Sequence, residues 1–494
     1  MLRCLQTVPF MLFLALPLLW STGCATKHAP TARLGDLYNR AAQFHGPERN
    51  PVVVIPGILG SRLEDPQAPR GRQVVWGAFD LGGSNLKTAA GLRDLALPMR
   101  KGAPLNELHD KVEATRALDR VSLRVFGLPI ELKAYAQILG VLGAGGYRDP
   151  AFGNPGSGID GTGVDFGEDH FTCFQFAYDW RRDIVENARR LDAFLDEKEA
   201  EISTIYREQY GIADPQITFD LVGHSLGALL TRYYLRHGAA EPDAPLVTAE
   251  TPNWSGARRV GNAILIAPPN AGSVKAFTEL LVGMDSRPFV YAPPAVIGTF
   301  PAAYQLMPRD RHRMVKLADG ESLYDVGVWE EREWGLLNPE QEDVLRQLLP
   351  GAGSDAKRRS IAREHVRKSL ERAAAIHRAM DRPASPPAST QIHLIAGDAI
   401  STPSEITPGR RGAFEVTNYE PGDNTVVRAS ALLDERVGAA DGAPWSPILR
   451  TPIDFDSVHF LFESHIGITK NPAFHDNLLY LLLEAPRPAV GVSE

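Results

Sequence analysis

Cysteine is scarce in this chain of 494 residues and occurs only at Cys4, Cys24 and Cys173. Cys4 belongs to an N-terminal segment with the features of a cleaved leader, so too few cysteines remain for a framework of disulfides. An excess of basic residues is missing as well, because the formal net charge is −8. A nucleic-acid binder needs a basic face to neutralise phosphates. We therefore expect a fold that relies on its hydrophobic core, and no nucleic-acid partner.

Signals of several other protein classes are also missing. No unit of about 20 to 50 residues repeats along the chain. The glycine-rich segment 143–167 lacks the Gly-Lys-Ser/Thr ending of a phosphate-binding loop, so we interpret it as a surface loop. No residue pattern indicates a metal or an organic cofactor, and the sequence predicts a protein that works without either.

The apolar run 8–20 is too short to cross a bilayer, which takes about 20 residues. Preceded by Arg3, it is typical of a signal peptide. Ser21-Thr22-Gly23-Cys24 resembles a bacterial lipobox with Cys24 as the lipidated residue, although Ser21 stands where such boxes usually carry leucine. Two interpretations stay open: residues 1–23 are a lipoprotein signal peptide, or they are an ordinary cleaved one. Both predict export, either to a membrane anchor on the periplasmic or outer-membrane side or as a secreted protein.

Short apolar runs alternate with helix-like stretches along most of the remaining chain. Continuous apolar strands of this kind, separated by helices, predict an α/β fold with a mostly parallel central sheet covered on both faces. The expected strands are 51–55, 171–177, 217–222, 263–267 and 392–396, and the expected helices include 183–209 and 228–237.

Two long stretches interrupt this alternation and look like insertions. Residues 62 to about 125 are rich in glycine, proline and leucine, and residues 270–389 separate two expected strands by far more than a usual connection. Within the second insertion, 355–382 has the pattern of a basic amphipathic helix, which is either a solvated face or a contact for anionic lipid. We predict a linker over 24–48 and one domain over 49–494 that carries both insertions.

The chemistry begins with Gly223-His224-Ser225-Leu226-Gly227, which follows an expected strand and precedes an expected helix. A turn this tight requires small residues on both sides of the serine, which is the nucleophile elbow typical of α/β-hydrolases. The N-terminus of the following helix favours negative charge on a reacting carbonyl oxygen. We therefore predict that Ser225 is a nucleophile, with a structural turn as the alternative.

An activated serine also needs an oxyanion hole. One donor is expected to be the backbone N–H of Leu226, the residue after the nucleophile. The loop after the first strand, Pro56-Gly57-Ile58, supplies the second, and we assign it to the N–H of Ile58. The alternative is an ordinary glycine-rich turn.

The general base and the acid are less constrained by the residues alone. His465 suits a loop just past the last strand, whereas His459 falls within or at the edge of that strand and His475 opens the C-terminal helix. Asp398 directly follows an expected strand, where α/β-hydrolases usually carry the acid, and Asp423 lies a hairpin length later. The residues slightly favour Asp398 and leave both open.

Six segments from residue 51 to the C-terminus resemble, in order, the lecithin:cholesterol acyltransferase family. That family includes lysosomal phospholipase A2 and phospholipid:diacylglycerol acyltransferase. The segments are PVVVIPGILGSRLE (51–64), YDWR (178–181), LVGHSLG (221–227), FPAAYQLMP (300–308), GDNTV (422–426) and HIGI (465–468).

The resemblance implies an α/β-hydrolase in which Asp423 is the acid of a triad with Ser225 and His465. It also implies the two oxyanion donors named above. The 62–125 insertion would be a membrane-binding and lid element, with Trp76 in the part that covers the site. The 270–389 insertion would be a helical cap that shapes the acyl pocket. Animal members carry a disulfide in the first element, and this chain has no cysteine there.

The implied function is a lipid O-acyltransferase that moves a fatty acyl chain from a phospholipid-type ester to an alcohol at a membrane surface. A phospholipase, triacylglycerol lipase or carboxylesterase would use the same residues with water as the acceptor. A third interpretation, from a different class, is a catalytically silent lipid-binding lipoprotein.

Overall fold

The computed structural model describes residues 33–44, 46–70, 73–77, 88–117, 121–125, 128–132, 134–151, 170–242, 252–286, 290–435 and 451–487. These residues belong to one unit, Arg33–Glu494. The predicted signal peptide 1–23, Cys24 and the first part of the 24–48 linker lie outside the described residues, as does most of the 143–167 loop. Among the helices that are described, none has the length and hydropathy needed to cross a membrane.

The centre of the molecule is a six-stranded sheet in which every neighbouring pair is parallel. Its strands are short and consist mainly of valine, isoleucine and leucine, because a parallel sheet is buried on both faces. The prediction of a mostly parallel sheet is confirmed. In spatial order the strands are β15 (Ser457–Leu461), β12 (Gln391–Gly397), β9 (Val260–Ile266), β8 (Phe219–His224), β1 (Val52–Ile55) and β7 (Cys173–Gln175).

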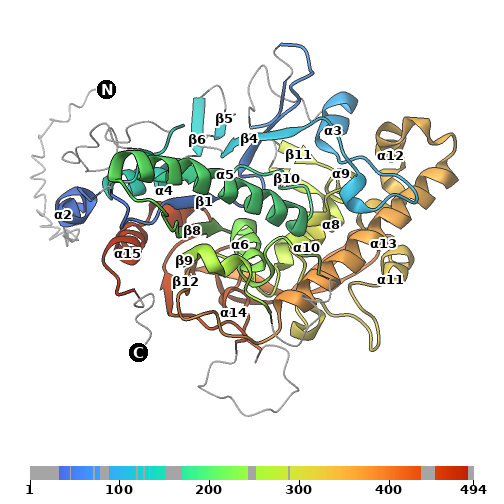
Figure 1. Ribbon diagram of the computed structural model, residues 1–494. Coiled ribbons are helices and arrows are strands. Elements are labelled where there is room, and N and C mark those ends of the chain that lie inside the picture. Colours follow the sequence, from blue (N-terminus) through green and yellow to red (C-terminus); the bar gives the residue numbers. More distant parts are fainter. Residues whose placement is uncertain are drawn as a thin grey trace, which may run out of the picture. The chain divides into compact units, whose positions relative to one another are not determined.

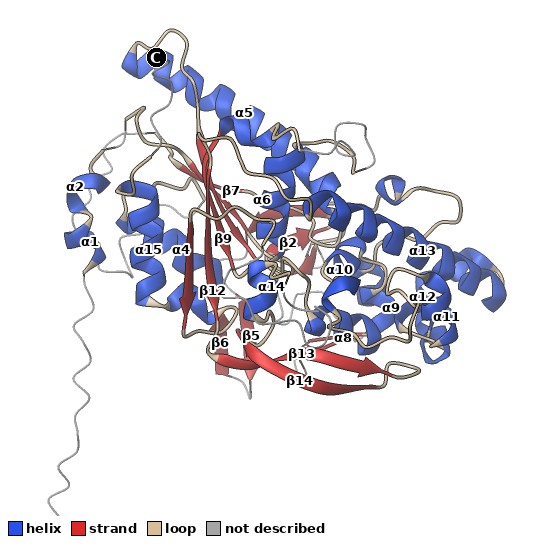
Figure 2. Ribbon diagram, turned by 90° about the horizontal axis from the view of Figure 1, so that it is seen from below, coloured by secondary structure: helices blue, strands red, loops and turns tan. Residues whose placement is uncertain are grey.

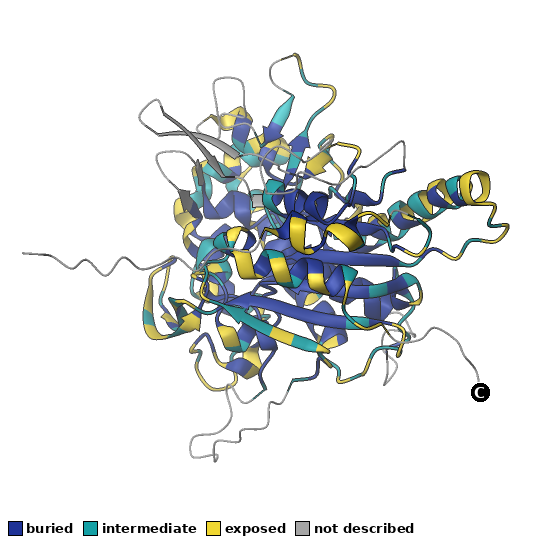
Figure 3. Ribbon diagram, turned by 90° about the vertical axis from the view of Figure 1, so that its left-hand side faces the viewer, coloured by how far each residue is buried: buried dark blue, intermediate teal, exposed yellow. Residues whose placement is uncertain are grey.

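Helices cover both faces of this sheet. Alternate residues of a strand point to opposite faces, so Val52 and Val54 pack with one set of helices while Val53 and Ile55 pack with the other. Figure 2 shows α4 and α15 on one side of the sheet and α5 and α6 on the other, and in Figure 3 the strands between them are buried. The covering helices are α4 (Ala134–Ala144), α15 (Pro472–Leu483), α5 (Ile184–Tyr210) and α6 (Leu226–His237).

The turn between β8 and α6 is held by close backbone contacts. Ser225 has φ 54° and ψ −120°, a combination that non-glycine residues rarely adopt. A Cβ on Gly227 would lie 2.3 Å from the carbonyl oxygen of Ile55 and 2.4 Å from that of Pro56. Glycine is therefore required here because α6 begins directly against the end of β1.

The 62–125 segment forms small antiparallel sheets outside the central one. A three-stranded sheet has the order β3-β2-β4, and a separate hairpin pairs β5 with β6. The elements are β2 (Ser61–Glu64), β3 (Val74–Trp76), α3 (Ala89–Leu95), β4 (Glu113–Ala117), β5 (Val121–Val125) and β6 (Leu128–Leu132).

The 270–389 segment is mainly helical, and Figure 1 shows its helices gathered beside the carboxyl end of the sheet, away from α4 and α15. A long hairpin of β13 (Ile400–Pro408) and β14 (Phe414–Gly422), followed by α14 (Arg428–Leu432), leads back to the core. The elements of the segment are α8 (Val274–Val282), β10 (Met284–Ser286), β11 (Val290–Ala292), α9 (Pro294–Ile297), α10 (Pro301–Gln305), α11 (Val326–Glu331), α12 (Glu342–Leu348) and α13 (Asp355–Met380). Two short helices, α1 (Leu34–Leu37) and α2 (Asn39–Ala42), precede β1.

The basic helix expected at 355–382 is α13. Its apolar face is buried, and most of its cations are paired with carboxylates. Arg372 bridges Asp183, the N-cap of α5, at 2.7 Å and Glu241 at 2.5 Å. This pairing favours a solvated, salt-bridged face over a lipid contact.

Gly227→Ala should destabilise the fold strongly, because the added methyl group would meet two backbone carbonyls that cannot move aside cheaply. We expect a lower melting temperature or loss of soluble protein, measured by thermal unfolding. Gly351→Ala is the control, since a Cβ there meets no atom within 4 Å. Equal melting temperatures for the two variants would contradict the close approach of α6 to β1.

Candidate functional site

Ser225 lies at the start of α6, directly after β8. Its amide donates to the carbonyl of Ile266 on β9 (2.8 Å), which anchors the strained turn to the neighbouring strand. The residue is buried apart from a small exposed fraction of 6%. The turn therefore presents the hydroxyl at the carboxyl end of the sheet, as the elbow motif predicts.

His465 and Asp423 complete a line of hydrogen bonds from this hydroxyl. His465 Nε2 lies 3.0 Å from Ser225 Oγ, and His465 Nδ1 lies 2.8 Å from Asp423 Oδ2. A carboxylate only accepts, so Nδ1 carries the proton and Nε2 is free to accept from the serine. Asp423 is buried, and its other oxygen accepts from the amides of Thr425 and Val426. The acid is thereby held in one orientation.

Asp398, which the residues alone slightly favoured as the acid, makes no hydrogen bond to His465 in the described part of the chain. Its carboxylate accepts from Arg428 Nη1 at 3.3 Å instead. The chain leaves β12 at Gly397, runs through the β13–β14 hairpin and returns to place Asp423 beside that glycine. The structure thus pairs His465 with Asp423, the residue that the family resemblance selected, and not with Asp398, which the residues alone slightly favoured.

The other two histidines occupy the places expected of them. His459 lies within β15, where it pairs in register with Ile395. His475 lies in the first turn of α15, and its Nε2 is 2.8 Å from the carbonyl of Thr469. Burial lowers the pKa of His475.

The loop after β1 faces the same space as Ser225. Ile58 lines the cavity described below, and the amide of Leu226 is the first of α6, where no intrahelical acceptor exists. Residues of the YDWR segment hold this loop: Tyr178 Oη donates to the carbonyl of Pro56 (2.7 Å), and Trp180 Nε1 donates to that of Ser61 (3.1 Å). The loop that carries Ile58 and the start of α6 that carries Leu226 thus both adjoin Ser225.

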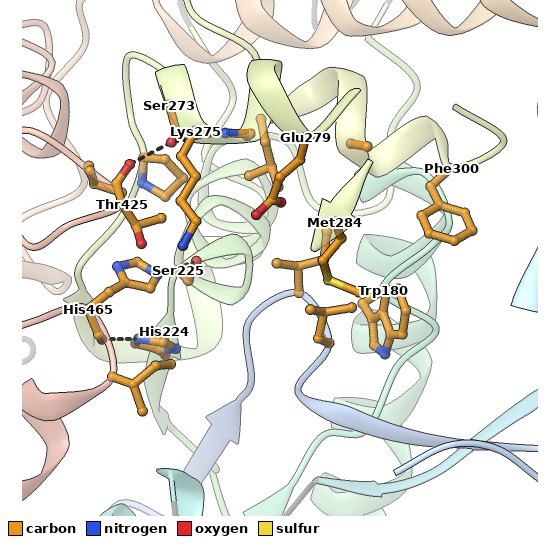
Figure 4. Close-up of a pocket in the computed structure, with 18 of the residues that line it drawn as sticks. Trp180, His224, Ser225, Ser273, Lys275, Glu279, Met284, Phe300, Thr425 and His465 are labelled. Atoms are coloured by element: carbon orange, nitrogen blue, oxygen red, sulfur yellow. Dashed lines mark hydrogen bonds between the residues drawn. The ribbon is translucent and has the colours of Figure 1, made fainter. Parts of the chain in front are cut away.

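A cavity of about 230 Å³ opens above Ser225 and His465 (Figure 4). Most of its wall is apolar and comes from the loop after β1, α8 and the segments that follow α8. Within the described residues, no group of His, Cys, Asp and Glu is arranged to hold a metal ion. The apolar wall consists mainly of Ile58, Leu59, Trp180, Met284, Ile297, Phe300, Ala303 and Leu306.

Two charged residues of α8, Lys275 and Glu279, also line this cavity. They are four residues apart and share a helix face, and Figure 4 shows both side chains extending into the space above Ser225. Burial raises the pKa of Glu279, and the charge of Lys275 partly opposes that effect. Sequence reasoning missed both residues, because helical periodicity identifies a face but not what lies opposite it.

Trp76 does not line the cavity. It is buried one layer behind, where its Nε1 donates to the carbonyl of Leu59 (2.9 Å) and its ring packs edge-on against Trp180 with centroids 5.4 Å apart. Leu59 and Trp180 are themselves wall residues. In this structure Trp76 supports the wall, and it is not placed as a cover over the site.

Residues 164–333 match the family model for lecithin:cholesterol acyltransferase, and this segment includes the elbow and the start of the cap. No curated protein matches the sequence significantly. Two solved structures resemble the chain distantly. One is the Tle4–Tli4 complex (16% identity, TM-score 0.49, 88% of this chain and 98% of that chain), and the other is lipase 1 from Pelosinus fermentans (13%, 0.27, 56% and 74%).

The predicted family and fold class are thereby confirmed. The parallel sheet with helices on both faces, the turn at Ser225 and the family match agree with one another. The match over residues 164–333 supports membership of the lecithin:cholesterol acyltransferase family, and with it a lipid acyltransferase or esterase on an α/β-hydrolase fold.

Proposed function

We propose that this protein is a lipid O-acyltransferase that moves a fatty acyl chain from a phospholipid-type ester to an alcohol through an acyl-enzyme on Ser225. The observation that carries the proposal is the line of hydrogen bonds from Ser225 through His465 to Asp423 at the floor of an apolar cavity. Nucleophile, base and acid are all present, which favours an enzyme over a silent lipid-binding protein.

The reaction follows from these positions. His465 Nε2 takes the proton of Ser225 as its oxygen attacks the ester carbonyl, and Asp423 keeps the imidazole in the required tautomer. The amides of Ile58 and Leu226 stabilise the oxyanion that forms. Collapse expels the alcohol of the donor, which receives the proton from His465. In the second half His465 deprotonates the acceptor, whose oxygen attacks the acyl-serine. The acyl–Oγ bond then breaks, the new ester leaves, and His465 returns the proton to Ser225.

The cavity supports a lipid substrate, and it favours an alcohol over water as the acceptor that attacks the acyl-enzyme. Its wall is mostly apolar, so it suits an acyl chain and excludes water, while Lys275 offers a cation to a donor phosphate. An acceptor alcohol delivered from a bilayer would then compete well with water. A phospholipase, triacylglycerol lipase or carboxylesterase would use the same line of residues, and the difference lies only in the acceptor.

We also propose that the protein acts outside the cytoplasm at a membrane surface. The apolar run 8–20 and the lipobox-like sequence at 21–24 support export, with Cys24 as the lipid anchor.

Ser225→Ala should abolish both esterase activity and labelling by a fluorophosphonate probe, because the probe phosphonylates only an activated serine. The labelled residue in the unmodified protein is identified by peptide mass spectrometry. His459→Ala serves as the control, since His459 lies within β15 and makes no contact with Ser225 among the described residues. A label that persists on folded Ser225→Ala protein would refute the assignment.

Asp423→Asn should lower kcat by roughly 10³ to 10⁴-fold, because the amide leaves His465 in the wrong tautomer. Asp398→Asn is the matched control: its carboxylate contacts Arg428 and not the histidine, so activity should stay within about twofold. The two rates are measured with a soluble ester alongside melting temperatures. The reverse order of severity would assign the acid to Asp398.

Transfer and hydrolysis are distinguished by the fate of the acyl chain. Vesicles of acyl-labelled phosphatidylcholine are offered with and without a long-chain alcohol or a sterol, and the label is followed into free fatty acid and new ester. We expect new ester to match or exceed free acid when an alcohol is present, because the cavity disfavours water. Free acid alone, across a range of acceptors, would leave a lipase or phospholipase.

A further inference from the structure

Two buried side chains connect the loop after β1 to the backbone of His465. Neither of them forms a hydrogen bond to Ser225 in the described part of the molecule. Tyr135 lies near the start of α4, under the sheet, and His224 is the last residue of β8. Both belong to the wall of the cavity. Neither has a part in the acyl-transfer steps described above.

The two side chains form one continuous chain of hydrogen bonds. The amide of Gly57 donates to Tyr135 Oη at 2.7 Å, Tyr135 Oη lies 3.1 Å from His224 Nδ1, and His224 Nε2 lies 3.0 Å from the carbonyl oxygen of His465. Figure 4 shows the last of these contacts, with the two histidines one above the other. The chain therefore begins in the loop after β1 and ends on the backbone of the proposed general base.

Chemistry fixes the direction of every bond in this chain. A carbonyl oxygen only accepts, so His224 Nε2 carries a proton and donates to His465. A neutral imidazole has a single N–H, so Nδ1 must accept, and the hydroxyl of Tyr135 donates to it. That hydroxyl oxygen is then free to accept from Gly57. One tautomer satisfies all three bonds.

The two side chains of this hydrogen-bond chain also keep the same charge as pH changes. Burial, and next the nearby His465, lower the pKa of His224 to about 3. Burial raises the pKa of Tyr135 above its ordinary value. The other charged group facing His224, Asp423, acts in the opposite direction and is outweighed. Both side chains thus stay neutral over the working range of pH and keep the same bonds.

The two ends of the chain are the parts of the site that must be placed most accurately. Gly57 immediately precedes Ile58, whose amide is a proposed oxyanion donor, and a Cβ on Gly57 would lie 2.9 Å from Ser225 Cβ. At the other end, His465 packs against His224 with ring centroids 5.0 Å apart. The loop after β1 and the loop after β15 come from strands that are not neighbours in the sheet, and His224 lies between them.

We propose that Tyr135 and His224 are positioning residues that hold the oxyanion loop and the general base in register through this single chain of hydrogen bonds. The proposal rests on the function proposed above. If either side chain loses its polar group, the reacting atoms are displaced although each triad residue remains. A displacement of about 1 Å in an active site can lower the rate about a hundredfold.

The first test compares Tyr135→Phe with Tyr147→Phe. Both remove a buried hydroxyl, but that of Tyr147 has no hydrogen-bond partner in the described part of the chain. Labelling rate at Ser225 and steady-state esterase kinetics are measured with melting temperatures. We expect Tyr135→Phe to lower kcat and the labelling rate by about ten- to a hundredfold with KM within about twofold, and Tyr147→Phe to leave all three unchanged.

The second test uses His224→Gln, which keeps a donor in the place of Nε2 but offers no ring nitrogen to Tyr135. Residues that act through one chain are not additive, so the double variant Tyr135→Phe/His224→Gln should be no slower than the slower single variant. His237→Gln is the control, because His237 is also buried and bonded to a carbonyl, at the far end of α6.

Each outcome assigns a cause. The positioning role would be overturned by any of three results. The effects of the two single variants multiply in the double variant, the loss is confined to KM, or the variants fold and label at an unchanged rate. If Tyr135→Phe does not fold, His224→Gln alone must show the fall in kcat at constant KM. Failure of the unmodified protein to label at Ser225 would instead refute the proposed function.

Discussion

The site depends first on the contact between the start of α6 and the end of β1. Gly227 lies so close to the carbonyls of Ile55 and Pro56 that no side-chain atom fits between them. As a result, the residue after the nucleophile and the loop after β1 meet at one place, with Ser225 between them. The places of these two backbone segments relative to Ser225 are therefore set by close backbone packing.

Asp423 and His465 are arranged around this fixed point. Both of their loops pack against the end of β12: a Cβ on Gly397 would lie 2.3 Å from the carbonyl of Glu463 and 2.9 Å from Asp423 Cβ. The β13–β14 hairpin carries Asp423 into this place. The amide of His465 also donates to the carbonyl of Asp423 at 2.8 Å, so the two loops are joined by backbone as well as by side chains.

Local patterns in the sequence predicted those parts of the molecule that local forces determine. Apolar strands and the glycines around Ser225 identify the sheet and the elbow, because burial and steric exclusion act on neighbours in the chain. The choice between Asp398 and Asp423 depends on where a hairpin returns, which no local pattern contains. Only the family resemblance selected the residue that the structure places against His465. The same holds for four other residues that line the cavity. Their roles depend on which side chains lie opposite them, and no local pattern contains that information: Lys275, Glu279, Tyr135 and His224.

Trp76 shows that a family resemblance can also misplace a side chain. The resemblance placed it over the site, yet it packs behind Leu59 and Trp180. A family motif indicates which segment approaches a site, but the layer in which a side chain ends depends on the packing of two separate insertions. The core of the resemblance therefore carries over to this chain more faithfully than its periphery.

The ion pairs of α13 bear on how firmly the 270–389 segment is held to the core. Arg372 fastens this long cap helix to Asp183, which caps α5 in the core, and to Glu241. Lifting the helix as a rigid body would strand a largely buried carboxylate without its cation, which is costly. α10, whose Ala303 lines the cavity, packs on α13. This part of the cavity wall is therefore fastened to the core by ion pairs as well as by apolar packing.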